Sequence, residues 1–161
     1  MILAIDPGPT ESAYVELGDC DLVFSSGKVP NSLLLSWLRS GFPFDRSQRL
    51  YCEMIASYGM PVGKEVFDTC VWIGRFAQAW DPESNGTFKQ VYRKDVKLHL
   101  CHSLRANDAA IRHAILDRYG GKAKAVGTKR AMGPLYNIKS DMWQALAVAL
   151  TAYDIVESKL V

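Results

Sequence analysis

Short apolar runs alternate along this chain with longer segments of helical periodicity. Runs bounded by turn residues predict β-strands, and apolar residues spaced three and four apart predict helices. The predicted strands lie at residues 1–6, 12–17, 21–26, 49–54 and 88–92. The predicted helices lie at residues 31–40, 64–80, 93–100, 107–119 and 140–159. This order predicts an α/β fold in which helices cover one mixed sheet.

The connections predict how the strands pair and where the helices end. Two short turns join the first three strands, which predicts an antiparallel meander. The fourth strand follows a crossover helix, so we expect it to run parallel to a neighbouring strand. Asn31 or Ser32 is the expected N-cap of the first helix. Asn107 is expected to cap the helix at 107–119, which Gly120 and Gly121 end.

The helix at 64–80 carries two apolar faces. One face is made by Val66, Cys70, Ile73, Ala77 and Trp80, and an offset face by Phe67, Val71 and Trp72. One face can pack on the sheet, so the other needs a cover, and we expect a second copy of the chain to supply it in a homodimer.

Two further expectations concern the end of the chain. Residues 121–139 contain basic residues, glycines and no acid, and are interpreted as a mobile basic loop. The closing helix is expected to bury one inner face, made by Met142, Ala145, Leu146, Ala149, Leu150 and Tyr153.

Composition and length set the class of protein. A chain of 161 residues predicts a single domain, residues 1–161, of ordinary soluble composition. Its four cysteines form no CxxC pair, which favours reduced thiols over disulfides or zinc. No signal peptide or membrane span is predicted, so we expect a cytoplasmic protein, bacterial or in a phage-infected host. The three histidines have no metal-ligand spacing, and Glu11 and Glu16 are interpreted as solvent-facing charges.

The net charge of +2 conceals a strong asymmetry along the chain. Residues 85–139 contain twelve Lys and Arg against three Asp and Glu, whereas the remainder contains seven against fourteen. A basic segment of this kind predicts a polyanionic partner.

Three acids have positions that indicate chemistry. Asp6 ends the first strand, Glu53 lies near the end of the fourth, and Asp141 lies in the first turn of the closing helix. Strand ends that are parallel neighbours lie about 5 Å apart, so we expect the three carboxylates to meet. Crowded carboxylates repel one another unless cations neutralise them, and oxygen ligands suit Mg²⁺ or Mn²⁺. Two such ions about 4 Å apart bind both the attacking water and the leaving oxygen of a phosphodiester.

The same features, in this order, resemble a known family. They are Ile-Asp-Pro-Gly at residues 5–8, the strand-end Glu53, and Asp141 ahead of Ala-Leu-Ala-Val-Ala-Leu at residues 145–150. The combination resembles the RuvC-type Holliday-junction resolvases, which are RNase H-like nucleases, and is most similar to compact bacteriophage versions. The resemblance implies an RNase H-like fold with a five-stranded mixed sheet, a homodimer, and Mg²⁺-dependent cutting of four-way DNA junctions.

The resemblance also implies roles for individual residues. It makes Asp6, Glu53 and Asp141 metal ligands. The family usually carries a further acid three residues after the third ligand, where this chain has Gln144, whose amide oxygen would ligate the metal or orient a water.

Basic residues supply candidates for binding the DNA backbone. Three of them open the helix at 93–100, where they gain nothing from the helix dipole, which favours phosphate contacts instead. The full set is Arg93, Lys94, Lys97, Lys122, Lys124, Lys129, Arg130 and Lys139.

Two alternatives to junction resolution stay open. The same fold could cut flaps or RNA–DNA hybrids, or the chain could bind junctions with catalysis impaired by Gln144. An ATP-binding protein of the actin and sugar-kinase type is excluded, because a second phosphate-binding glycine loop and about twice the length would be needed.

Overall fold

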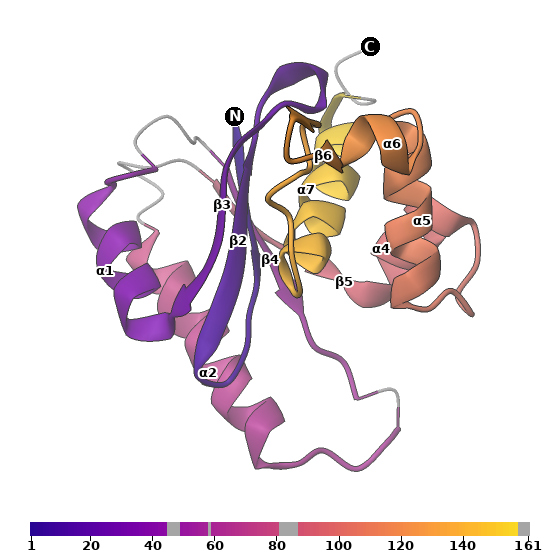
Figure 1. Ribbon diagram of the computed structural model, residues 1–161. Coiled ribbons are helices and arrows are strands. Elements are labelled where there is room, and N and C mark those ends of the chain that lie inside the picture. Colours follow the sequence, from indigo (N-terminus) through magenta and orange to yellow (C-terminus); the bar gives the residue numbers. More distant parts are fainter. Residues whose placement is uncertain (45–48, 58, 81–86, 158–161) are drawn as a thin grey trace.

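One twisted sheet forms the centre of the molecule in the computed structural model, which describes residues 1–44, 49–57, 59–80 and 87–157 (Figure 1). Its strands are β1 (Ile2–Asp6), β2 (Glu11–Leu17), β3 (Val23–Pro30), β4 (Arg49–Met54) and β5 (Thr87–Tyr92). They lie in the order β3-β2-β1-β4-β5. The first three are antiparallel, and β4 runs parallel to both β1 and β5. The prediction of a mixed, five-stranded sheet is confirmed.

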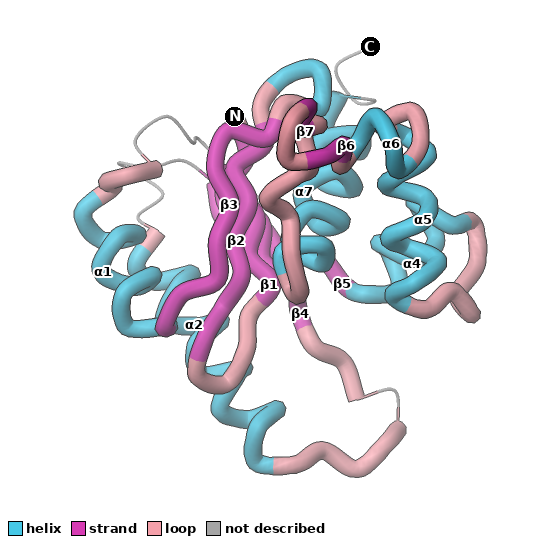
Figure 2. Tube along the Cα trace, viewed as in Figure 1, coloured by secondary structure: helices cyan, strands magenta, loops and turns pink. Residues whose placement is uncertain are grey.

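Helices cover both faces of this sheet. On one face lie α1 (Asn31–Ser40) and α2 (Lys64–Ala79); on the other lie α4 (Arg93–Cys101), α5 (Asp108–Arg118) and α7 (Met142–Glu157) (Figure 1). The described residues also form shorter elements, namely the 3₁₀ turn η1 (Asp19–Asp21), α6 (Lys122–Ala125), β6 (Gly127–Thr128) and β7 (Ala131–Met132) (Figure 2). Among the described residues, no helix has the length and apolar character that crossing a membrane requires.

Alternation along the strands divides the core into two layers. Leu3 and Ile5 of β1 face α1 and α2, whereas Ile2 and Ala4 face α7. Successive side chains of a strand point to opposite faces, so the Asp6 side chain points to the same face as Ile2 and Ala4, which is the face that α7 covers. The strand period alone therefore directs this carboxylate to the face that the closing helix covers.

The middle of helix α7, residues 145–152, is buried on all sides, rather than on one inner face as predicted. It packs on β1 and β2, and α4 and α5 cover its outer side. All residues from 145 to 152 are buried, including Ala147 and Val148, which lie outside the predicted face. Small alanine side chains allow the close approach on both sides. Residues 158 and 159, which the prediction included, lie outside the described residues.

Residues 121–139 form structure, contrary to the prediction of a mobile loop. The helix α6 and the β6–β7 hairpin occupy most of the segment, and Ala125, Leu135 and Ile138 join the core. Gly133 lies so close to α6 that an added Cβ would be 2.2 Å from the carbonyl oxygen of Lys124. This glycine therefore permits close packing of the segment against α6 and does not mark an open loop.

Three local predictions also differ from the structure. The side chain of Asn31 does not cap α1; it is buried and accepts a hydrogen bond from Ser12 Oγ at 2.6 Å. On α2 the buried residues are Thr69, Ile73 and Phe76, so the inner face is rotated from the predicted one. Glu16, expected in solvent, is buried on β2.

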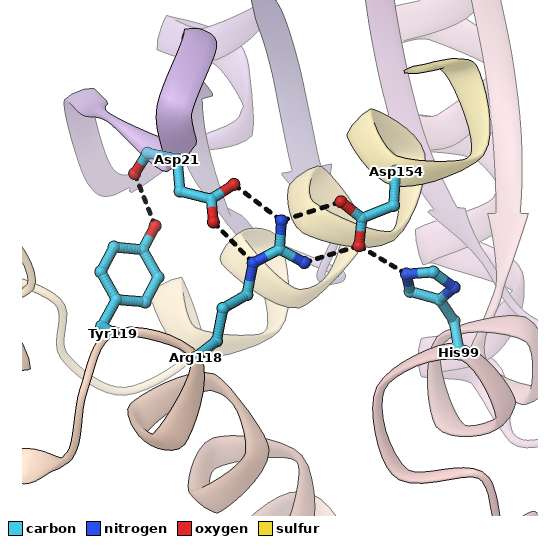
Figure 3. A network of polar contacts seen from close by, with 5 residues as sticks. All are labelled: Asp21, His99, Arg118, Tyr119 and Asp154. Atoms are coloured by element: carbon cyan, nitrogen blue, oxygen red, sulfur yellow. Dashed lines mark hydrogen bonds and ion pairs between the residues drawn. The ribbon is translucent and has the colours of Figure 1, made fainter. Parts of the chain in front are cut away.

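A polar cluster fastens the helical layer to the sheet at the end where β1 begins (Figure 3). The Arg118 guanidinium of α5 donates to both carboxylate oxygens of Asp21, at 2.6 and 2.8 Å, and to both of Asp154, at 2.5 and 2.8 Å. His99 Nε2 lies 2.6 Å from Asp154, and the Tyr119 hydroxyl donates to the Asp21 carbonyl oxygen. We call these five residues the Arg118 cluster.

Candidate active site

Asp6 and Glu53 lie side by side at the ends of two adjacent parallel strands. The register pairs Ile5 of β1 with Cys52 of β4, so the next residues are Asp6 and Glu53. Both line an open cleft of about 350 Å³, together with Arg93 and residues that follow the two strands. The expectation that these two carboxylates meet is confirmed by the register.

The turn after Asp6 is fixed by a small hydrogen-bond network. Asn31 Nδ2 donates to the Gly8 carbonyl oxygen at 2.9 Å, and Ser12 Oγ links Asn31 to the Gly8 amide. A Cβ on Gly8 would lie 2.4 Å from the Glu11 carbonyl oxygen, so the close approach of the backbone requires glycine. The turn residues of the Ile-Asp-Pro-Gly motif thus hold the end of β1 in place.

The two carboxyl groups are crowded and hold a proton more tightly than usual. Burial, followed by the charge of Glu53 and a hydrogen bond with it, raises the pKa of Asp6 to about 8. Burial also raises the pKa of Glu53, against the opposing effect of the Arg93 charge. A cation bound between the carboxylates would remove this repulsion, so the pair has the oxygen donors and the unbalanced charge that a divalent metal ion needs.

Arg93 enters the same cleft from the first residue of α4. Its Nη1 lies 3.5 Å from Glu53 Oε1 and donates a hydrogen bond to Gln144 Oε1 at 2.5 Å. Its Nη2 pairs with Asp108 at the start of α5. The guanidinium therefore links the sheet to α4, α5 and α7 at one point, and Gln144 is an acceptor for it.

Asp141 lies just before α7 rather than in its first turn, and its carbonyl oxygen accepts from the Gln144 and Ala145 amides. Its carboxylate pairs with Lys28 Nζ at 2.6 Å. The charge of Asp141 contributes to raising the pKa of Asp6, so the third acid lies within electrostatic range of the pair. Across the described parts of the chain, no group of three or more Asp, Glu, His or Cys side chains has the arrangement of a metal site.

The predicted DNA-binding residues fall into two groups. Arg93, Lys94 and Lys97 line, with Leu104, a second cleft of about 250 Å³ beside the carboxylate cleft. Lys139 lies two residues before Asp141. The remaining four, Lys122, Lys124, Lys129 and Arg130, lie on α6 and the β6–β7 hairpin, at the opposite end of the sheet from the carboxylates (Figure 1).

Three residues of the site were missed by the sequence interpretation. They are Lys28, which holds Asp141, Asn31, which fixes the turn after Asp6, and Asp108, which pairs with Arg93. Lys28 shares a row with Asp6 across three strands, because Asp6 pairs with Ala13 and Ala13 with Lys28. The strand register would have predicted this neighbour; no sequence signal indicates the partner of Arg93.

Comparison with known proteins identifies the fold. No protein-family model matches the sequence, and no match is found among curated proteins. The structure is similar to Thermus thermophilus RuvC, with a TM-score of 0.72 and 15% identity over 98% of this chain and 96% of that one. It is also similar to T. thermophilus RuvC in complex with a Holliday junction substrate, with a TM-score of 0.67 and 14% identity over 98% and 94% of the two chains. The chain has the RNase H-like fold of RuvC, as the sequence resemblance implied.

Proposed function

We propose that this protein is a metal-dependent, structure-selective endonuclease that resolves four-way DNA junctions. The observation that carries the proposal is the crowded Asp6–Glu53 pair at the adjacent ends of β1 and β4, where burial and, after it, the charge of Glu53 raise the pKa of Asp6 to about 8. Support comes from the basic cleft beside it and from the fold, which the chain shares with a RuvC solved with a Holliday junction substrate.

Asp6 and Glu53 are the residues that would hold the metal ion, and Asp141, expected from the sequence as a third ligand, lies at the edge of the site beside Lys28. Mg²⁺, or Mn²⁺ as its substitute, would supply the activation of water for attack on the phosphodiester and the stabilisation of the leaving oxygen. Asp6 would give up its proton on binding a cation, because the positive charge would offset the repulsion from Glu53. Lys28 keeps Asp141 at the edge of the site through their 2.6 Å ion pair.

Lys94 and Lys97 hold the DNA backbone in this proposal. They line the cleft that adjoins the carboxylates, and Lys94 Nζ also lies 5.7 Å from the centre of the Tyr92 ring. Contacts of this kind position a strand without reading its bases. We therefore expect selectivity for the shape of the junction, with binding that weakens as salt rises.

A homodimer would present two such sites to the two strands of a junction. The offset face of α2 leaves Phe67 60% and Val71 61% exposed, which is the apolar surface that a second copy would cover. Sedimentation of the wild type and of Phe67→Asp measures this, and the variant is expected to be monomeric. A monomeric wild type would contradict the dimer.

Cleavage of synthetic substrates tests the activity. With Mg²⁺, the wild type is expected to cut a four-way junction in preference to a flap or an RNA–DNA hybrid. Asp6→Asn is expected to lower the rate by at least about 1,000-fold, as loss of a central catalytic group does. Asp154→Asn is the matched control. It changes a carboxylate at the opposite end of α7, and the variant should keep its activity. Absence of cleavage in Mg²⁺ and Mn²⁺, or normal cleavage by Asp6→Asn, contradicts the proposal.

One observation favours a second function, junction binding without cleavage. Gln144 occupies the place of an expected acid and is engaged by Arg93. A binding protein would keep its junction affinity in EDTA and would cut nothing with Mn²⁺. The same substrates therefore distinguish the two functions.

A further inference from the structure

The positive charge of Arg93 lies inside the acidic site rather than on the outer surface. Its side chain is 23% exposed, and its guanidinium contacts Glu53, Gln144 and Asp108. Because Arg93 opens α4 directly after β5, the neighbour of β4, the fold itself brings the guanidinium to the strand ends that carry the carboxylates.

The hydrogen bond from Arg93 occupies the oxygen that Gln144 would offer to a metal ion. Gln144 Oε1 accepts from Arg93 Nη1 at 2.5 Å, and its amide nitrogen cannot ligate a cation. A divalent ion on the same oxygen would lie against the guanidinium, and two positive charges so close repel strongly. Gln144 is therefore unsuited to metal ligation while Arg93 is in place.

The pairing of charges around the cleft leads to the same conclusion. Asp141 is paired with Lys28, and Asp108 with Arg93. Asp6 and Glu53 are the two carboxylates that line the cleft, and Arg93 already lies 3.5 Å from Glu53, so their negative charge can balance one divalent ion but not two.

Arg93 also forms the boundary between the two clefts. It lines the carboxylate cleft with Asp6 and Glu53, and it lines the basic cleft with Lys94 and Lys97. A DNA strand whose phosphates follow the basic cleft toward the carboxylates has to pass the guanidinium. The flat fork of an arginine suits the oxygens of a phosphate.

We infer that Arg93 takes the place of a second metal ion in this chain. The site binds one divalent ion, at Asp6 and Glu53, and Arg93 contacts the phosphate that is cut, while Gln144 is a positioning residue that holds the guanidinium. This inference rests on the proposed nuclease function and replaces the two ions expected from the sequence with one.

Counting bound Mn²⁺ tests the inference without reference to cleavage. Titration calorimetry, with electron paramagnetic resonance of bound Mn²⁺, should give one ion per chain for the wild type and no signal from a coupled pair of ions. The double variant Arg93→Gln/Gln144→Glu removes the guanidinium and restores an acid, and should bind two ions. Arg105→Gln, which removes an exposed arginine outside the cleft, should still bind one.

Cleavage then tests contact with the phosphate. Arg93→Gln should cut a junction at least about 100-fold more slowly than the wild type, with Arg93→Lys recovering part of the rate because it keeps the charge. Gln144→Ala should lower the rate less than Arg93→Gln, with the one-ion count unchanged, because it loosens the guanidinium without removing it.

The outcomes separate this inference from the proposed function. A wild type that binds two ions and cuts junctions overturns the inference and leaves the function intact. One ion in the wild type without any cleavage overturns the function, and with it the role of Arg93 at the phosphate. A folded double variant that still binds one ion also overturns the inference. If that variant does not fold, the ion count and the electron paramagnetic resonance spectrum of the wild type decide whether the site holds one ion or two.

Discussion

The two ends of the sheet are each built around one arginine among carboxylates, and they differ in how the charges are matched. At one end, Arg118 donates to all four oxygens of Asp21 and Asp154. At the other, Arg93 lies 3.5 Å from Glu53 and pairs with Asp108, while Asp6 shares its surroundings with Glu53. The same residue types therefore form two different kinds of site.

The pKa values of the acids report this difference. Burial alone would raise the pKa of Asp154, but hydrogen bonds from Arg118 and His99 hold it below its ordinary value. Burial and Glu53 raise the pKa of Asp6 to about 8. Matched charges stabilise the fold at the Arg118 end, whereas Asp6 and Glu53 remain crowded at the other end, where we propose that a cation binds.

The largest expected effect on stability comes from breaking the Arg118 cluster. Arg118→Ala should lower the free energy of unfolding by about 2 kcal/mol, because Asp21 and Asp154 lose charged hydrogen bonds. For a chain of this size, the melting temperature should fall by about 4–8 °C. Arg105→Ala is the control and should change stability by less than about 0.5 kcal/mol. Equal melting temperatures for the two variants would show that the Arg118 cluster does not stabilise the fold more than an exposed arginine does.

Neutralising one carboxylate at each end should change stability in opposite directions. At pH 8 in EDTA, Asp6→Asn should raise the free energy of unfolding by about 1–2 kcal/mol, because it relieves repulsion with Glu53. Asp154→Asn should lower it by about 1 kcal/mol through weaker bonds with Arg118. Urea unfolding measures both, and destabilisation by Asp6→Asn would show that Asp6 is a stabilising charge.

The pH dependence should carry the same contrast. The folded chain keeps the Asp6 proton up to about pH 8, whereas the unfolded chain releases it near 3.8, so this group stabilises the fold less as pH rises. Between pH 5 and 8 in EDTA, the wild type should lose about 1 kcal/mol or more relative to Asp6→Asn. Asp154 acts in the opposite sense. Because its pKa is lowered in the folded chain, it adds stability at pH values above its ordinary pKa, and this stability is lost as the pH falls into the acid range. Parallel stability curves for wild type and Asp6→Asn would contradict this.

The smallest expected effect on stability is that of a metal ion at the Asp6–Glu53 pair. At a Mg²⁺ concentration about five times the dissociation constant, mass action should stabilise the wild type by about 1 kcal/mol. Asp6→Asn should lose this gain, and Arg118→Ala should keep it. Thermal unfolding with and without Mg²⁺ measures it, and a gain that survives Asp6→Asn would place the ion elsewhere.

Local sequence pattern predicted the strands β1, β2, β4 and β5 and the Asp6–Glu53 pair, whereas β3, predicted at residues 21–26, begins at Val23 and extends to Pro30. The apolar run of β1 ending in Asp6, and β4 carrying Glu53, have the predicted positions, and parallel pairing brings the two acids together. The Asn107 cap was also predicted, and its Oδ1 accepts from the Ala110 amide at 2.9 Å. These features depend on residues close in sequence or on a single pairing of strands.

Predictions that required knowledge of the helical layer were less accurate. The all-round burial of α7 depends on α4 and α5 covering its outer side, which no periodicity within α7 reveals. The close packing of residues 121–139 likewise depends on contacts with the core, where Leu135 and Ile138 are buried.

The strand that ends in Asp6, the partner carboxylate at Glu53 and the α/β class follow from local sequence pattern, because the period of the apolar residues indicates which side of an element is buried. The positions and contacts of the arginines depend instead on how distant elements pack together. Arg93 and Gln144 are 51 residues apart, and Arg118 and Asp21 are 97 apart. The packing of distant elements selects these charge partners. It places Arg118 between Asp21 and Asp154, and it places Arg93 beside Glu53.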